Sequence, residues 1–173
     1  MNLYKSKIPI KVYKKKFKDM RGYFQEIYLK KIFKLNIKFT AIAHSRKNVI
    51  RGLHFQIRNK QFKLVYVISG KILDVAVNLK KNSRNFGKIY KYILNDGDLL
   101  FIPSYYAHGY ECLSKKCTVL YHLEKYRDPA SERGIPFNDK KLKIKWKTKN
   151  PIISQRDKSH ISLEEFINKY KGL

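Results

Sequence analysis

The stretch from residue 49 to residue 123 constrains the fold of this chain more than any other part. It consists of short segments rich in Val, Ile, Leu and Tyr, separated by turn-forming residues such as Ser69-Gly70 and Asn95-Asp96-Gly97-Asp98. The extended segments are residues 49–55, 63–69, 71–79, 88–94, 99–102, 106–112 and 117–123. Strands spaced this closely, with almost no helical sequence between them, predict a β-sandwich or a small β-barrel. The periodicity alone does not choose between the two.

The flanking segments predict a few peripheral elements around this β-rich centre. An N-terminal strand is expected near residues 8–13, a turn at 19–22, an extended stretch at 23–28 and a short helix at 29–35. Residues 151–157 are expected to be irregular. Ser162-Leu163-Glu164-Glu165 is a capping box that predicts a packing helix over about 162–171. We find no repeat or linker, so we expect residues 1–173 to form a single domain.

Composition excludes several classes of protein. Apolar residues make up 43% of the chain and aromatic residues 14%, too many for a disordered protein. The two cysteines, Cys112 and Cys117, are too few to staple a domain of this size, so we expect buried or half-buried thiols in a reducing compartment. The start lacks the apolar run of a signal peptide, and no stretch is long enough to span a bilayer. We therefore expect a cytoplasmic protein without membrane contact.

A formal net charge of +26 raises the question of nucleic-acid binding. The 39 basic residues are mostly Lys and are spread through the whole chain, without an Arg-rich arm or a recognisable nucleic-acid-reading motif. We therefore predict no nucleic-acid partner. The same charge would still attract an anionic small substrate.

The segment Val49-Ile50-Arg51-Gly52-Leu53-His54-Phe55-Gln56 places a permanent cation beside a group that titrates near neutral pH. Such a pair suggests an anion-binding site that transfers protons. Side chains alternate along a strand, so Arg51 and His54 should not share a strict face, and Gly52 marks a bend or a close backbone approach. The alternative interpretation is a strand that happens to carry two polar residues.

The pattern Gly97-x5-Pro103 followed by Ala107-His108-Gly109 is typical of jelly-roll cupins. Metal-binding cupins place two histidines and a carboxylate in the first motif. Here that motif offers only His54, because position 56 is Gln and no acidic residue follows before Asp74. A tight transition-metal site needs three or four protein ligands, so we predict no catalytic metal.

Many short blocks occur in the order found in one enzyme family. They are Arg51-Gly52-Leu53-His54-Phe55-Gln56, Lys63-Leu64-Val65, Asp74-Val75-Ala76-Val77, Phe86-Gly87-Lys88, Ile102-Pro103, Ala107-His108-Gly109-Tyr110, Leu120-Tyr121, Glu132-Arg133-Gly134-Ile135, Asn138-Asp139, Ile144-x-Trp146 and Pro151-Ile152-Ile153-Ser154-x-x-Asp157. From about Phe17 to Asp157 the chain resembles the dTDP-4-dehydrorhamnose 3,5-epimerase family. The resemblance implies an all-β, cupin-like jelly roll with a few short peripheral helices. It also implies epimerisation at C3, C5 or both of a nucleotide-diphosphate-linked 4-keto sugar, without a cofactor, in deoxysugar and surface polysaccharide biosynthesis.

The chemistry of such a sugar explains why these residue types are needed. Hydrogens beside the ketone are acidic, so a base, an acid across the ring and a cation near the ketone oxygen suffice for inversion. By resemblance His54 is the base, Tyr121 the acid and Lys63 the cation. Asp157 would orient His54, with Asp74 as the alternative partner.

The resemblance also implies the substrate-binding residues. Arg51 suits a diphosphate because its guanidinium can engage two oxygens. His108 would line the same pocket, and Ser45, Gln56 and Asp74 belong to the same expected site. Phe17, Arg21 and Glu26 match a block that contacts the nucleotide, often from the neighbouring subunit, which implies a homodimer.

The chain departs from the family where Gln-x-Asn-x-Ser-x-Ser is usual. Phe39, Ala41, Ala43 and Ser45 stand there instead, so lost hydrogen bonds worth roughly 1 kcal/mol each should weaken or redirect sugar recognition. Asn78 replaces a frequent Asp, which we interpret as structural. Alternatives are therefore an epimerase of one carbon only or of another nucleotide sugar, such as a 4-keto-heptose, and a non-catalytic basic cupin. The combination of His54, Lys63, Tyr121 and Asp157 argues against a pure binding protein.

Overall fold

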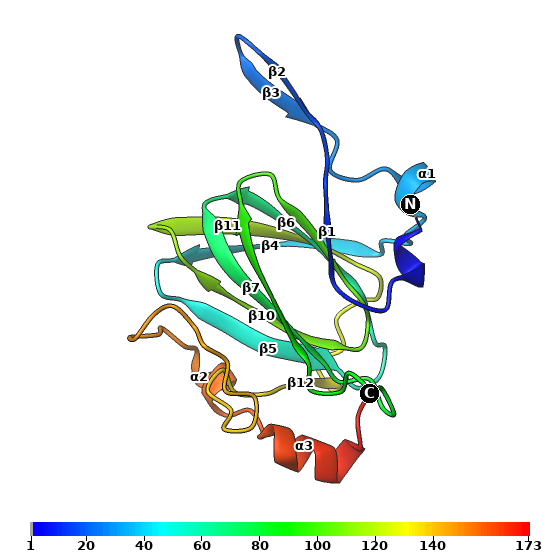
Figure 1. The fold of residues 1–173 in the computed structure, drawn as a ribbon, viewed down its shortest axis with the longest axis vertical. Coiled ribbons are helices and arrows are strands. Elements are labelled where there is room, and N and C mark those ends of the chain that lie inside the picture. The colour runs from blue at the N-terminus through cyan, green and yellow to red at the C-terminus, as the bar shows by residue number, and fades with distance from the viewer. Residues whose placement is uncertain (1) are drawn as a thin grey trace.

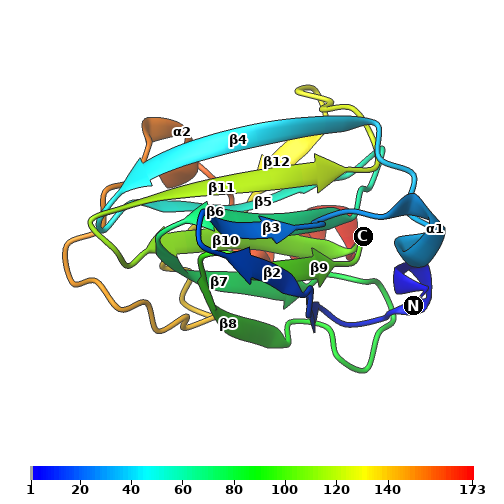
Figure 2. The same cartoon turned by 90° about the horizontal axis from the view of Figure 1, so that it is seen from above.

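Two antiparallel sheets face each other in the computed structural model, which describes residues 2–173 (Figures 1 and 2). Within those residues, one five-stranded sheet has the order β1-β9-β6-β11-β4 and the other the order β12-β5-β10-β7-β8. The first contains β1 (Ile10–Val12), β9 (Leu99–Ile102), β6 (Lys63–Ser69), β11 (Lys116–Leu123) and β4 (Phe39–Arg46). The second contains β12 (Glu132–Gly134), β5 (Ile50–Gln56), β10 (Tyr106–Cys112), β7 (Lys71–Asn78) and β8 (Ile89–Asn95). The predicted all-β jelly-roll architecture is confirmed.

Apolar side chains fill the space between the sheets and also cover their outer faces. Val65 and Val67 of β6 point into the inter-sheet core, whereas Leu64 and Tyr66 pack on the other side against the N-terminal segment. A strand buried on both faces reads as a continuous apolar run. This double burial explains why 63–69 stood out in the sequence.

The N-terminal region forms a hairpin that projects from the two sheets (Figure 1). It consists of β2 (Lys16–Asp19) and β3 (Gly22–Gln25), joined at the turn predicted for residues 19–22. A short helix follows, α1 (Lys30–Phe33), and it ends where Lys34 adopts a left-handed conformation. A 3-10 turn, η1 (Leu3–Lys5), precedes β1.

The C-terminal helix α3 (Leu163–Tyr170) confirms the predicted capping box. The Glu165 N–H donates to Ser162 Oγ at 3.1 Å, and the Ser162 N–H donates to the Glu165 carboxylate at 2.7 Å. The ring of Phe166 packs edge-on against Phe55 of β5, with centroids 5.0 Å apart. As predicted, this helix serves packing.

The elements that were not predicted include β4, β12 and α2 (Gln155–Lys158). β4 is an edge strand that pairs only with β11 among the described strands, and its outward face carries Ile42 among polar residues, which obscures the alternation. β12 is only three residues long and forms by pairing with β5. The helical turn α2 (Gln155–Lys158) lies at the end of a stretch expected to be irregular, and Ser154 caps it by accepting from the Asp157 N–H at 3.1 Å.

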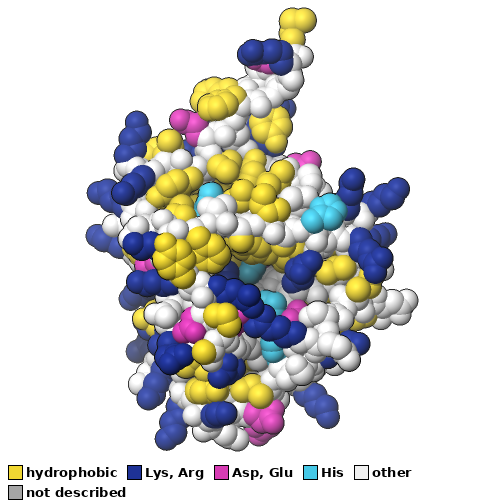
Figure 3. Space-filling model, turned by 180° about the vertical axis from the view of Figure 1, so that it is seen from behind, with side chains coloured by type: hydrophobic (Ala, Val, Ile, Leu, Met, Phe, Trp, Pro, Cys, Tyr) yellow, Lys and Arg dark blue, Asp and Glu magenta, His cyan; other side chains and the backbone are white. Residues whose placement is uncertain are grey.

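The distribution of basic side chains and the state of the two cysteines match what the sequence predicts. On the face drawn in Figure 3, Lys and Arg side chains are scattered and do not form one patch. Cys112 and Cys117 are buried free thiols. Among residues 2–173, none of the helices is long and apolar enough to cross a bilayer.

Candidate active site

A cavity of about 270 Å³ opens between the two sheets. One wall is formed by β4, β6 and β11, and the other by β5, β10 and β12. The lining residues include Phe39, Ala41, Ala43, Arg51, His54, Gln56, Gln61, Lys63, His108, Tyr110, Tyr121, Leu123, Arg127 and Glu132. Figure 3 shows a hollow with histidine side chains in its floor and basic side chains beside it. The fold thus brings the two strand faces that carry the predicted chemistry to one chamber.

An irregularity in β5 lets Arg51 and His54 line the same cavity. The two residues are three positions apart on β5 but pair with positions only two apart on β10, so β5 carries one extra residue. A bulge of this kind resets the alternation of side chains. The expectation that the two side chains do not share a face is therefore wrong.

Gly52 lies at this bulge, with a φ of +118°. A Cβ atom built on Gly52 would lie 2.6 Å from the Cα of Gly109 on β10, closer than real side chains approach. The predicted close backbone approach at this glycine is confirmed.

Asp157 is the carboxylate that pairs with His54. His54 Nε2 lies 2.8 Å from Asp157 Oδ1, and the Gly52 N–H donates to Asp157 Oδ2 at 3.0 Å. Burial raises the pKa of Asp157, but the imidazoles of His160 and His54 and the Gly52 N–H outweigh burial and hold it well below its ordinary value. An ionised carboxylate only accepts hydrogen bonds, so the His54 proton belongs on Nε2. Nδ1 of His54 is then left with a free lone pair.

Asp74 pairs with a different histidine. It is fully buried, and its Oδ2 lies 2.7 Å from Nε2 of His108, so it is not the partner of His54. The His108 ring lies edge-on to Tyr121, with centroids 6.1 Å apart. Asp74 does not line the cavity itself, but its hydrogen-bond partner His108 does.

Tyr121 and Lys63 face this histidine wall from the opposite sheet. Burial raises the pKa of Tyr121 well above its ordinary value, so the phenol keeps its proton at neutral pH. Burial also lowers the pKa of Lys63 to about 8, although the charges of Asp74 and Glu132 oppose that shift. The cavity therefore holds a proton donor and a cation that can still titrate.

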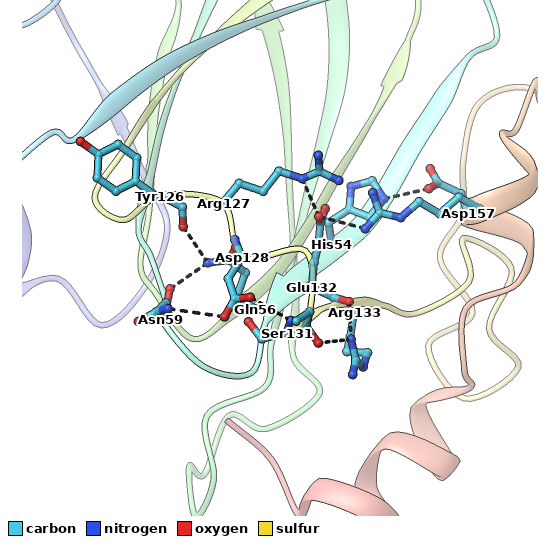
Figure 4. A network of polar contacts seen from close by, with 12 residues as sticks. His54, Gln56, Asn59, Tyr126, Arg127, Asp128, Ser131, Glu132, Arg133 and Asp157 are labelled. Carbon is cyan, nitrogen blue, oxygen red and sulfur yellow. Dashed lines mark hydrogen bonds and ion pairs between the residues drawn. The ribbon is translucent and has the colours of Figure 1, made fainter.

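Of the residues expected to bind the substrate, Arg51 and Gln56 line the cavity and Ser45 does not. Arg51 lines the cavity, and its Nε donates to Ser45 Oγ at 2.9 Å. Ser45 is 3% exposed and outside the cavity lining; its hydroxyl is also bonded to the Tyr110 hydroxyl at 2.8 Å. Gln56 reaches the cavity wall, but its side-chain oxygen accepts from the Asp128 N–H at 2.6 Å and so holds the neighbouring loop (Figure 4).

Phe17, Arg21 and Glu26 are not brought to the cavity. All three are exposed on or beside the β2–β3 hairpin, and Arg21 is paired with Asp19 in the hairpin turn. None of the three lines the cavity that contains His54 in the described chain.

Comparison with known proteins identifies the family. Residues 9–165 match the family described as dTDP-4-dehydrorhamnose 3,5-epimerase. This chain belongs to the dTDP-4-dehydrorhamnose 3,5-epimerase family. The family enzyme of Shigella flexneri is 36% identical over 91% of this chain and 93% of its own length, and that of Methanothermobacter thermautotrophicus is 38% identical over 86% of each.

Solved structures agree with the family assignment. The dTDP-4-dehydrorhamnose 3,5-epimerase of Bacillus anthracis, with TDP and PPi bound, has a TM-score of 0.87 at 32% identity and covers 94% of this chain and 97% of its own. The Legionella pneumophila epimerase, in complex with dTDP-4-keto-L-rhamnose, has a TM-score of 0.82 at 31% identity and covers 87% of this chain and 85% of its own.

The departures from the family pattern fall on the cavity wall. Phe39, Ala41 and Ala43 all line the chamber from β4, and Ala41 pairs with Tyr121 across β4 and β11. In this member of the epimerase family the wall beside the predicted acid is therefore apolar.

Sequence reasoning missed a group of charged residues at the cavity mouth. Arg127 Nε donates to the Glu132 carboxylate at 2.7 Å (Figure 4). An Arg156 nitrogen lies 2.9 Å from the same carboxylate oxygen. Glu132 was visible only as part of the block Glu132-Arg133-Gly134. Arg127 lies in a loop without periodic signal, so it could not have been found from spacing.

Proposed function

We propose that this chain epimerises C3, C5 or both of a dTDP-linked 4-keto sugar by moving protons with its own side chains. The observation that carries the proposal is that His54 and Tyr121 line one cavity from opposite sheets. A sugar ring between them would have one face toward an imidazole and the other toward a phenol.

The proposed reaction begins at a C–H bond beside the ketone. His54 Nδ1 accepts the proton, the electron pair of that bond forms an enolate, and the Lys63 ammonium stabilises the charge on the ketone oxygen. Asp157 stabilises the imidazolium that results. Tyr121 then donates its proton to the opposite face of the same carbon, which inverts the centre.

The nucleotide diphosphate would bind where the cavity is basic. Arg51 lines the cavity together with His54, and the net charge of the chain favours an anionic substrate. Relatives found with TDP and PPi, or with dTDP-4-keto-L-rhamnose, support a ligand of this class.

The apolar wall of Phe39, Ala41 and Ala43 favours a second possibility for the sugar. Because these side chains cannot hydrogen-bond to hydroxyl groups, the cavity would tolerate a 4-keto sugar that differs from the usual substrate on that side. A single-carbon epimerase or one that acts on another nucleotide sugar, such as a 4-keto-heptose, remains the alternative.

We also propose a homodimer in which the β2–β3 hairpin completes the partner's site. Support comes from exposed apolar side chains on the hairpin, where Met20 is fully exposed and Phe24 is 66% exposed. Each chain would act as one domain, because the C-terminal segment that packs on β5 also supplies Asp157. Since Cys112 and Cys117 are thiols, the cytoplasm is the expected compartment.

Hydrogen exchange tests the proposed reaction. We expect the enzyme, incubated with dTDP-4-keto-6-deoxyglucose in deuterium oxide, to place deuterium at C3, C5 or both as followed by NMR. His54→Asn should lose this exchange by roughly 10²-fold or more while keeping its fold by circular dichroism. A parallel incubation with a nucleotide-linked 4-keto-heptose tests the alternative substrate. Exchange by the His54 variant at the parent rate would show that another group is the base.

Mixing two inactive variants tests the dimer. If the hairpin acts on the partner's cavity, dimers formed from His54→Asn and Arg21→Ala chains contain one intact site, and activity should return on mixing. The hairpin would act within its own chain if the mixture stayed inactive although size exclusion detects mixed dimers.

A further inference from the structure

His160 lies behind the His54–Asp157 pair and has no role in the proposed reaction. It follows Asp157 by three residues and lies two residues after the last residue of α2. Its Nε2 lies 3.5 Å from Asp157 Oδ1. Its ring stands edge-on to the His54 ring, with centroids 5.4 Å apart and an interplanar angle of 85°. Two imidazoles therefore approach the same carboxylate oxygen.

The environment of His160 is tight and its hydrogen bonding is incomplete. The side chain is only 9% exposed, and apart from the 3.5 Å approach to Asp157 its buried Nε2 has no hydrogen-bond partner among residues 2–173. A Cβ built on Gly134 of β12 would lie 2.3 Å from the His160 ring, so only a glycine there leaves room for the imidazole. Buried polar atoms without partners are uncommon in folded proteins, so this nitrogen is available to a ligand.

We propose that His54, Asp157 and His160 form a binding site for a divalent transition-metal ion such as Zn²⁺, and that the bound ion switches the enzyme off. Each residue offers one ligand atom, and the three atoms lie within 4.8 Å of one another. Tetrahedral Zn²⁺ with bonds of about 2.0–2.2 Å separates its ligands by about 3.3–3.5 Å, so small side-chain movements would close the site. Two imidazoles and one carboxylate suit zinc, cobalt and nickel.

The surroundings favour these metals over Mg²⁺ or Ca²⁺. Hard cations need several oxygen ligands, whereas this cluster offers a single carboxylate and two nitrogens. The strongly basic chain also opposes a cation that is held by charge alone. Because His54 also lines the substrate cavity, a fourth coordination position can face solvent or substrate.

Metal binding would disable His54 through its tautomer. A metal ion on Nε2 displaces the proton that Asp157 otherwise holds there, and a neutral imidazole then carries its proton on Nδ1. The nitrogen that should accept a proton from the sugar would have no free lone pair. This inhibition rests on the proposed function, but metal binding itself does not.

Titration of the untagged, EDTA-treated protein with Zn²⁺ and Co²⁺ tests the site. By calorimetry we expect one Zn²⁺ per chain at this site, and with Co²⁺ we expect visible absorption bands of a low-coordinate site. His160→Gln should weaken Zn²⁺ binding by more than about 10-fold, the lower end of what the loss of a supporting partner costs a metal site. The matched control is His122→Gln, because Nε2 of His122 is also buried without a partner but lies outside the cavity lining. That control should bind Zn²⁺ like the parent.

A second variant keeps the test decisive if His160→Gln does not fold. His54→Ala removes the central imidazole and should weaken Zn²⁺ binding to a similar degree. Binding of Zn²⁺ to either folded variant with parent affinity would overturn the proposal, as would equal binding of Mg²⁺ and Zn²⁺ by the parent.

Measuring deuterium exchange with and without Zn²⁺ tests the metal site and the proposed function separately. Zn²⁺ should stop deuterium exchange by the parent, EDTA should restore it, and His160→Gln should need more than about 10-fold more Zn²⁺ for the same inhibition. If the metal-free parent exchanges no hydrogen but still binds Zn²⁺ through His160, the proposed function fails and the metal site stands. If Zn²⁺ binds the parent at this site without slowing exchange, the inhibitory role is wrong.

Discussion

The charge on Lys63 gives a prediction that can be worked out from the structure. Burial lowers the pKa of this ammonium to about 8, so it is about nine-tenths charged at pH 7 and about one-tenth charged at pH 9. If the enolate oxygen needs the cation, deuterium exchange at subsaturating substrate should fall about tenfold between these pH values. The pKa of the Tyr121 phenol is raised well above 10, so Tyr121 does not titrate in this range and cannot produce the same decline.

The stability of the fold should move in the opposite direction. Because the pKa of Lys63 is lower in the folded state than in the unfolded chain, the unfolded chain binds more protons between about pH 8 and 10.5. The Lys63 contribution to the free energy of unfolding therefore increases as pH rises through this window. A decline in exchange without a decline in melting temperature would separate loss of the cation from unfolding.

Substitution of Lys63 supplies the matched control. Lys63→Arg keeps a positive charge at every pH in the assay, so its exchange rate, although lower, should stay level from pH 7 to 9. Lys63→Met should be slow throughout, without an alkaline decline. The assay is NMR-detected exchange in buffered deuterium oxide, with the enzyme-free rate subtracted at each pH. A level profile for the parent, or the same decline in Lys63→Arg, would refute the assignment of the cation to Lys63.

Three further predictions follow from the site and the C-terminal helix. Tyr121→Phe should still exchange hydrogen from the face toward His54, but inversion should be impaired. NMR should therefore find deuterium in unepimerised sugar. Full epimerisation by this variant would contradict the role of the phenol. Asp157→Asn should slow exchange by roughly 10²-fold, because an amide can donate to Nε2 of His54 and so favour the tautomer with the proton on Nδ1. A rate near that of the parent would exclude Asp157 as the orienting group. Ser162→Ala should lower the free energy of unfolding by about 1 kcal/mol and the melting temperature by about 2–4 °C, without changing deuterium exchange. An unchanged melting temperature would show that the cap does not stabilise the fold.

The strands that were predicted well are those whose sequence repeats with a clear period or is apolar throughout. β6 and β10 are buried along most of their length, so burial alone marks them in the sequence. β4 was missed because it lies at a sheet edge, where an exposed Ile42 breaks the alternation. The helical turn of α2 was missed because one side-chain cap at Ser154 starts it, and four residues are too few to show a helical period.

Some residues of the candidate site were likewise predicted from the sequence, and others were found only in the structure. The resemblance named His54, Lys63, Tyr121 and Asp157, and the fold brings the first three to one cavity and Asp157 to the imidazole of His54. Arg127 and the carboxylate of Glu132 went unnoticed because they belong to a loop and a three-residue strand. Their proximity depends on where that loop docks, which no local pattern encodes.

The sequence by itself determined which segments are extended, where the C-terminal helix begins and which family the chain resembles. These properties follow from short-range preferences and from the order of motifs along the chain. Tertiary structure alone decided that His54 pairs with Asp157 and not with Asp74, although 103 residues separate His54 from Asp157. It also decided that the β5 bulge turns Arg51 toward the same cavity and that His160 approaches the shared carboxylate. The physical reason is that partnerships between distant side chains form only when sheets and loops pack together.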